Sequence, residues 1–382
     1  MKAPGLVLNA SFALTGALTT LLGPLLPSLI SQWSLADRNA GRLFATQFFS
    51  ATLGAALQGW ITSRIRATWC LTAAYALMAV SVATLTTGSF AMGVVRVSLY
   101  GFALGVTIPT VNLIAGQRAP ARKTAALNLL NMCWCAGAVF APLLIGALLP
   151  SHGLPSVLMG FGGLLLAAAL LTLAFPVGAG PGASSRPEPG LAPARGVPAA
   201  WLVAVFLFLY VGVENTVSGW ISVFALRALQ LPVATASAAL SGFWMALMMA
   251  RGYLAFGRRI PSARVLLVGS LCAAGAGTAT LVLASGPLKL IAGAALTGAG
   301  LGPVFPGIVA LYQDRAGAER SIGLVFAFSG CGGAVLPWLA GLLSSSAHDP
   351  RATMWVGLIA TMLLLVLLKP AMPGQVRPQS TV

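Results

Sequence analysis

One carboxylate, Glu214, lies inside a long apolar run that extends from Trp201 to Leu226. The whole chain has only six Asp and Glu residues, and an ionisable group at mid-helix in a membrane costs about 2.5–3.5 kcal/mol on insertion scales. Such groups usually serve as substrate ligands or proton carriers. On a helix, Tyr210 and Ser218 share the face of Glu214. We expect Glu214 to bind solute or carry a proton; the alternative is a permanently neutral acid that joins two helices.

Arg96 is the basic residue that lies deepest in a predicted helix, and Tyr100 continues its face. Three roles are open to it. It can be the counter-charge of Glu214, it can donate to solute hydroxyls or a carboxylate, or its long side chain can snorkel to the outer interface.

Neutral amides and aromatic rings suit sugars, because amides bond hydroxyls and rings cover the apolar sugar face. The candidates of this kind are Asn112, Asn215, Trp220, Trp244 and Phe305. Amides also join membrane helices, and Trp often marks the membrane interface. A structural role is therefore the alternative for each of these residues.

Enzyme chemistry has little support in the sequence. There is no phosphate-binding loop, dinucleotide fingerprint, HExxH or EF-hand pattern. Glu214 has no second carboxylate for a paired-acid site, and the two His and five Cys residues do not have zinc spacing. We expect no enzyme activity, no cofactor and no metal.

The composition indicates a polytopic membrane protein. Hydrophobic residues make up 58% and charged residues 7%, with a mean hydropathy of +0.91, against roughly 45–50% and 25% in soluble domains. At about 20 residues per crossing, the chain can hold twelve helices. The predicted helices are 5–31, 41–63, 68–87, 91–116, 124–149, 154–175, 200–227, 232–256, 263–285, 288–312, 320–345 and 352–369. Pro303 and Pro306 predict either a break or a bend in the tenth.

The net charge of +16 is explained by orientation and not by nucleic acid. With both termini cytoplasmic, sixteen of the 22 Lys and Arg residues fall on the cytoplasmic side, Arg251 among them, and five on the other. Lys and Arg collect on the cytoplasmic side. We therefore expect a bacterial-type cytoplasmic (inner) membrane, a lipid bilayer as surroundings and no nucleic-acid partner.

The chain divides near its middle. Residues 177–199 are rich in Gly, Pro, Ala and Ser, which predicts a cytoplasmic linker between an amino-terminal bundle, 1–176, and a carboxy-terminal bundle, 200–382. Gly137, Pro142 and Gly146 recur 195 positions later as Gly332, Pro337 and Gly341. Two six-helix halves of this kind are found in transporters.

Three stretches carry a family resemblance: FLYVGVENTVSGW from Phe208, LNLLNMCWCAGAVFAPLL from Leu127 and FSGCGGAVLPWLAG from Phe328. The chain resembles the major facilitator superfamily over its whole length, and within it the fucose-permease-like branch of sugar:proton symporters. The resemblance implies an all-α membrane fold of twelve helices in two pseudo-symmetric bundles around a central cavity. It places Glu214 at the glutamate of the family's YVGxE stretch and Arg96 near a common fourth-helix arginine.

The predicted function is secondary transport of a small polar solute, a sugar or sugar-like compound, by alternating access with proton symport through Glu214. The alternatives are an exporter of amphipathic compounds or drugs, a uniporter, and a membrane sensor that transports nothing. We expect a monomer. Charged residues at the cytoplasmic ends of the two halves predict an ion-pair gate, formed by Arg64, Arg66, Asp314, Arg315 and Glu319.

Overall fold

The computed structural model describes residues 3–119, 123–176, 198–257, 261–313 and 322–371. The helices of the amino-terminal half are α1 (Ala3–Thr19), α2 (Leu22–Trp33), α3 (Asp37–Arg64), α4 (Ala67–Ala83), α5 (Phe90–Arg118) and α6 (Lys123–Ala174). Those of the carboxy-terminal half are α7 (Pro198–Val223), the π-helical turn η2 (Phe224–Ala228), α8 (Val233–Phe256), α9 (Ala263–Val282), α10 (Pro287–Leu301), α11 (Val304–Gln313), α12 (Ile322–Ala347) and α13 (Arg351–Ala371).

Two of the predicted helices are broken in the structure. The first is split into α1 and α2, which meet at an angle of 46°. Pro24 lies in the first turn of α2. It has no backbone N–H, but N–H groups in the first turn of a helix have no intrahelical acceptor, so no hydrogen bond is lost. The tenth is split into α10 and α11 on either side of Gly302 and Pro303. Conversely, α6 contains the fifth and sixth predicted helices, which Gly153 separates with a left-handed φ of 74°.

The helices can account for twelve membrane crossings. Within the described residues, eight helices are long and apolar enough to cross a membrane, and the bent pair α1–α2 gives a ninth. One of the eight is α6, which supplies two crossings because of its turn at Gly153. The more polar α3 and the shorter α4 complete the twelve. The predicted all-α membrane fold is therefore confirmed.

The glycine repeat of the sequence corresponds to the same helix–helix contact in both halves of the structure. A Cβ added to Gly137 on α6 would lie 1.8 Å from the carbonyl oxygen of Ala13 on α1, and one added to Gly332 on α12 would lie 1.9 Å from that of Phe208 on α7. Both pairs are related by the same displacement of 195 residues. Only glycine allows the two backbones to approach this closely, so the two halves use the same packing at the same place.

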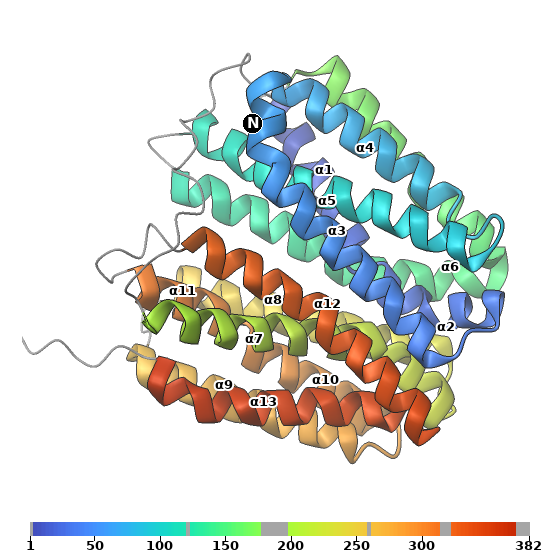
Figure 1. The fold of residues 1–382 in the computed structure, drawn as a ribbon, viewed down its shortest axis with the longest axis vertical. Coiled ribbons are helices and arrows are strands. Elements are labelled where there is room, and N and C mark those ends of the chain that lie inside the picture. Colours follow the sequence, from blue (N-terminus) through green and yellow to red (C-terminus); the bar gives the residue numbers. More distant parts are fainter. Residues whose placement is uncertain (1–2, 120–122, 177–197, 258–260, 314–321, 372–382) are drawn as a thin grey trace, which may run out of the picture.

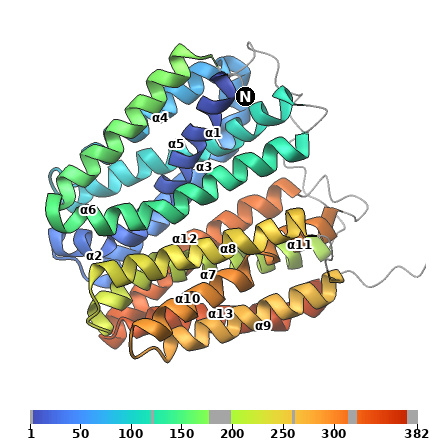
Figure 2. The ribbon, with the colours of Figure 1, turned by 180° about the vertical axis from the view of Figure 1, so that it is seen from behind.

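The two halves lie side by side as separate bundles (Figure 1), and the view from behind shows the same division (Figure 2). They are joined chiefly by α3 packed on α12 and by α6 packed on α8. We call the end that contains Asp37 and Arg351 the Asp37 end. We call the opposite end, where α6 finishes at Ala174 and α7 begins at Pro198, the linker end.

Candidate functional site

Glu214 lies near the middle of α7, with its side chain 13% exposed. The hydroxyl of Tyr210, one turn earlier, donates to its Oε2 at 2.7 Å. Ser218, one turn later, donates instead to the backbone carbonyl of Glu214, also at 2.7 Å. The predicted shared face is therefore present, but of its two hydroxyl groups only that of Tyr210 bonds the carboxylate.

The counter-charge of Glu214 is Arg251, and not Arg96. The Nη2 of Arg251, on α8, lies 3.4 Å from Glu214 Oε2 and 3.2 Å from the Tyr210 hydroxyl oxygen. The sequence analysis counted Arg251 only among the cytoplasmic residues. Arg251 lies near the linker end of α8, and its side chain, which is 30% exposed, points toward α7 and meets Glu214. An arginine stem extends over several bonds and can carry its charge well away from its own Cα.

Arg96 turns away from this pair. Its Nη1 donates to the carbonyl oxygen of Thr87, in the connection between α4 and α5 at the Asp37 end. Of the three roles considered for Arg96, this position corresponds to a side chain that reaches toward the interface.

Two cavities meet at Glu214. The smaller, of about 150 Å³, lies between the two halves and is lined by Thr19, Thr20, Gly23, Phe44, Phe48, Trp134, Val211, Glu214, Asn215, Ser218, Gly219 and Trp244. The wider, of about 530 Å³, is lined by Asn128, Asn131, Met132, Cys135, Tyr210, Val211, Glu214, Arg251, Leu254, Phe305 and Pro306. Glu214 and Val211 border both. The wider cavity lies toward the linker end, because Asn128 is close to the start of α6 and Leu254 to the end of α8.

Three further predicted residues line these cavities. Asn215 and Trp244 border the smaller one, and the Nε1 of Trp244 is buried without a hydrogen-bond partner among the described residues. Phe305 borders the wider one, and its ring lies 5.6 Å from that of Tyr210. Phe305 and Pro306 directly follow the break between α10 and α11, so the break opens onto the wider cavity.

Other predicted residues make structural contacts away from the cavities. Trp220 is fully buried and its Nε1 donates to the carbonyl of Pro337 at 2.9 Å. Tyr100 is also buried and donates to Gln47 Oε1 at 3.0 Å. The amide of Asn112 donates to the carbonyl one turn earlier on its own helix.

The predicted cytoplasmic gate is only partly described. The guanidinium of Arg64 lies 4.1 Å from the ring centre of Trp60, and Arg66 is exposed just before α4. Asp314, Arg315 and Glu319 lie outside the described residues. The ion pairs between these two groups stay a prediction.

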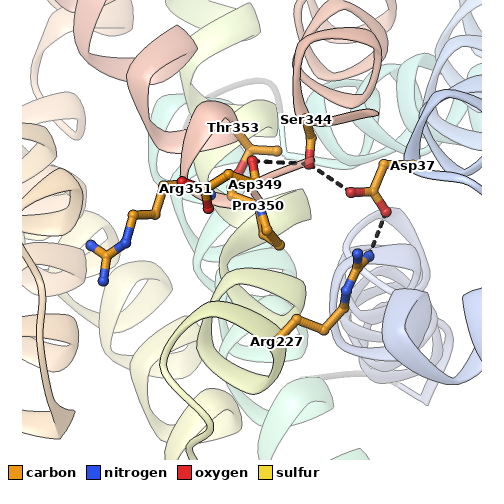
Figure 3. A network of polar contacts seen from close by, with 7 residues as sticks. All are labelled: Asp37, Arg227, Ser344, Asp349, Pro350, Arg351 and Thr353. Carbon is orange, nitrogen blue, oxygen red and sulfur yellow. Dashed lines mark hydrogen bonds and ion pairs between the residues drawn. The ribbon is translucent and has the colours of Figure 1, made fainter. Parts of the chain in front are cut away.

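At the opposite end the structure contains an ion pair that the sequence analysis missed. Asp37, at the start of α3, is 4% exposed. Its Oδ1 accepts a bond from Arg227 Nη1 on η2 at 2.5 Å, and its Oδ2 accepts one from Ser344 Oγ on α12 at 2.6 Å. Figure 3 shows the carboxylate between these two partners. We call these three residues the Asp37 latch; they join the amino-terminal half to the carboxy-terminal half.

Glycines bring the backbones together directly beside the latch. A Cβ on Gly41 of α3 would lie 3.1 Å from Trp338 Cα on α12, and a Cβ on Gly341 would lie 2.6 Å from the carbonyl oxygen of Asp37. The helices therefore touch with no side chain between them. The Asp37 end is closed here by backbone packing as well as by the latch.

The geometry agrees with what comparison with known proteins finds. A family model described as Major Facilitator Superfamily matches residues 8–321. The chain belongs to the major facilitator superfamily. It is accordingly a membrane transporter for a small solute and not an enzyme, as the sequence predicts.

Solved structures of the same fold cover nearly the whole chain, whereas no curated protein matches it. A point mutant of the nucleoside transporter NupG aligns with a TM-score of 0.79 at 14% identity, covering 97% of this chain and 99% of that one. A second NupG structure gives 0.74 at 16%, covering 97% and 98%. A bacterial homologue of the human lysosomal transporter Spinster, inward-facing and unoccupied, gives 0.68 at 16%, covering 97% and 95%. At these identities the likeness concerns the fold.

Proposed function

We propose that this protein is a proton-coupled symporter that moves a small, polar, sugar-like solute by alternating access. The observation that carries the proposal is the position of Glu214, which borders both cavities and bonds Tyr210 and Arg251. A carboxylate in contact with a cavity can exchange a proton with the water in it. Its two protonation states differ in charge, and therefore in how strongly they hold Arg251.

The solute binds in the wider cavity and extends toward the smaller one. A volume of about 530 Å³ falls within the usual range of roughly 300–1,000 Å³ for ligand pockets. Asn128 supplies an amide group for hydroxyls, and Phe305 supplies an aromatic ring. Asn131 supplies its side-chain oxygen as an acceptor, because its amide nitrogen donates to the carbonyl of Leu127 one turn earlier. The fucose-permease-like stretches favour a sugar, and the named substrate of NupG, a nucleoside, also carries a sugar ring.

Alternating access is supported by the difference between the two ends of the molecule, one closed and one with a cavity. In the described conformation the Asp37 latch and the Gly41–Gly341 contact close the Asp37 end, whereas the wider cavity lies toward the linker end. With the predicted orientation, the linker end is cytoplasmic and this conformation faces inward. Rocking of the halves 1–176 and 200–382 about their shared interface opens the Asp37 end and breaks the latch.

Two transport assays, counterflow exchange and uphill uptake, show whether Glu214 carries the proton or only binds solute. The solute is first selected as the sugar or sugar-like compound that most raises the thermal stability of the purified protein. In proteoliposomes, Glu214→Gln removes uphill uptake driven by a pH gradient but keeps counterflow exchange of labelled for unlabelled solute. Exchange needs binding and rocking, but no release of a proton.

The matched control is Asp349→Asn, the same chemical change in a carboxylate at the Asp37 end that bonds the backbone N–H of Arg351. This variant is expected to keep both activities. Uphill uptake by Glu214→Gln at the wild-type rate contradicts the proposal. Outward pumping of amphipathic dyes, without uptake of any sugar, favours the exporter instead.

A further inference from the structure

The most informative feature of the site is the arginine that neutralises its acid. Arg251 and Glu214 are the two charged side chains among the described residues that line the cavities. The other titratable groups facing Glu214 are Tyr210 on α7 and Cys135 on α6. Of the other helices packed on α7, α12 has no charged residue, and α10 and α13 carry theirs near their ends, at Lys289, Arg351 and Lys369.

A proton that binds Glu214 alone leaves the site with an unpaired positive charge. The Arg251 side chain is 30% exposed, and no second acid lines the cavities to replace Glu214 among the residues that the structure describes. Removal of one partner from a poorly solvated ion pair is strongly unfavourable, because the remaining charge keeps its desolvation penalty. A neutral sugar cannot compensate this charge. An anionic solute can.

Arg251 also has an N–H donor that makes no hydrogen bond in the described structure. Its Nη2 contacts Tyr210 and Glu214, but its Nε is buried without a hydrogen-bond partner among the described residues. Buried donors are nearly always satisfied in folded proteins, so an exception needs an explanation. A planar guanidinium fork matches the two oxygens of a carboxylate. A solute carboxylate in the wider cavity provides the missing acceptor once the guanidinium leaves Glu214 and turns its fork toward the cavity.

We propose that the solute is an acid: a hydroxylated monocarboxylate of the sugar-acid class, whose carboxylate pairs with Arg251 while Glu214 holds a proton. The proposal rests on the proposed function of Glu214 as proton carrier. Solute and Glu214 compete for one guanidinium, so each solute anion enters with one proton. On release, the proton leaves Glu214, and the ionised carboxylate forms its ion pair with Arg251 again as the solute departs. The amide of Asn128 and the side-chain oxygen of Asn131 bond the hydroxyls.

The first test compares acids with neutral sugars of the same skeleton: gluconate and glucuronate against glucose, and galacturonate against galactose. Thermal stability of the full-length protein is measured over a range of pH. We expect the acids to stabilise it and the neutral sugars not to. Because binding and protonation are linked, the apparent Kd of the acid rises about tenfold per pH unit once Glu214 is ionised in the empty protein.

Single substitutions test the contributions of Glu214 and Arg251 to acid binding separately. Glu214→Gln, which imitates the protonated acid, is expected to bind the acids with little dependence on pH. Arg251→Gln is expected to weaken acid binding at least about tenfold, while Arg251→Lys keeps part of it. Asp349→Asn behaves as the wild type. Unchanged acid binding in Arg251→Gln, or stabilisation by glucose equal to that by gluconate, overturns the proposal.

A second test needs no variant. One proton with one monocarboxylate moves no net charge, whereas one proton with a neutral sugar moves a positive charge. In proteoliposomes, a potassium–valinomycin potential is expected to leave acid uptake unchanged while a pH gradient drives it. Uptake of a neutral sugar driven by the potential and abolished in Glu214→Gln refutes the acidic solute but keeps the proton role of Glu214. Acid uptake that stays proton-driven in Glu214→Gln refutes that role instead.

Discussion

Replacement of Asp37 by Asn should open the Asp37 end. The asparagine oxygen can still accept from Ser344, so the loss falls on the charged bond to Arg227. Hydrogen bonds to charged groups are worth about 1.5–3 kcal/mol, but Arg227 is 44% exposed, and exposed pairs are worth only about 0–1 kcal/mol. We expect a shift of about 1–2 kcal/mol, which is a factor of roughly 5–30 in the ratio of the two conformations.

The assay is a distance distribution between spin labels at Ala36, just before α3, and Ser346, in the last turn of α12, which lie at the Asp37 end on opposite halves. The labels are introduced in a background without the five native cysteines. Asp37→Asn and Arg227→Gln are each expected to increase the long-distance population, and the double variant to add little to either. Arg38→Gln, an exposed neighbour, is the control. Additive effects, or no change in Asp37→Asn, refute the latch.

Two further predictions concern packing. Gly332→Ala should lower the free energy of unfolding by about 1–3 kcal/mol, as overpacked sites do, because its Cβ would collide with the carbonyl of Phe208. Gly160 has open space around it, so Gly160→Ala should be neutral or slightly stabilising. Equal melting temperatures for the two variants contradict the close approach. Trp220→Phe should lose the bond to Pro337 and about 0.5–1.5 kcal/mol of stability, while the solute KM stays unchanged. A raised KM with unchanged stability places Trp220 in the binding site after all.

The sequence identifies Glu214 because a single acid in a long apolar run is a local signal. Its partner Arg251 has no such signal. Arg251 lies in the last two turns of α8, where basic residues usually belong to the interface, and only the packing of α8 beside α7 shows that the side chain meets Glu214. The choice between Arg96 and Arg251 therefore depends on tertiary contacts that periodicity does not encode.

The repeat and the latch show the same difference between local and distant information. Gly137 and Gly332 could be matched by spacing alone, and the structure shows that each meets an equivalent helix. Asp37, in contrast, resembles an ordinary acidic residue in the first turn of a helix. It is buried because η2 and α12, far away in the sequence, cover it. Trp220 looked like a sugar-stacking ring, but it is enclosed between α7 and α12.

The proposed symport depends on Glu214 as the carrier of the proton that accompanies the solute. The most direct measurement records solute uptake and internal pH together in proteoliposomes loaded with a pH indicator, with solute added outside and no pH gradient imposed. Wild-type protein and Asp349→Asn are expected to acidify the interior as solute enters, with one proton for each solute molecule. Glu214→Gln is expected to exchange solute without acidification. Acidification by Glu214→Gln at the wild-type ratio rules out Glu214 as the proton carrier.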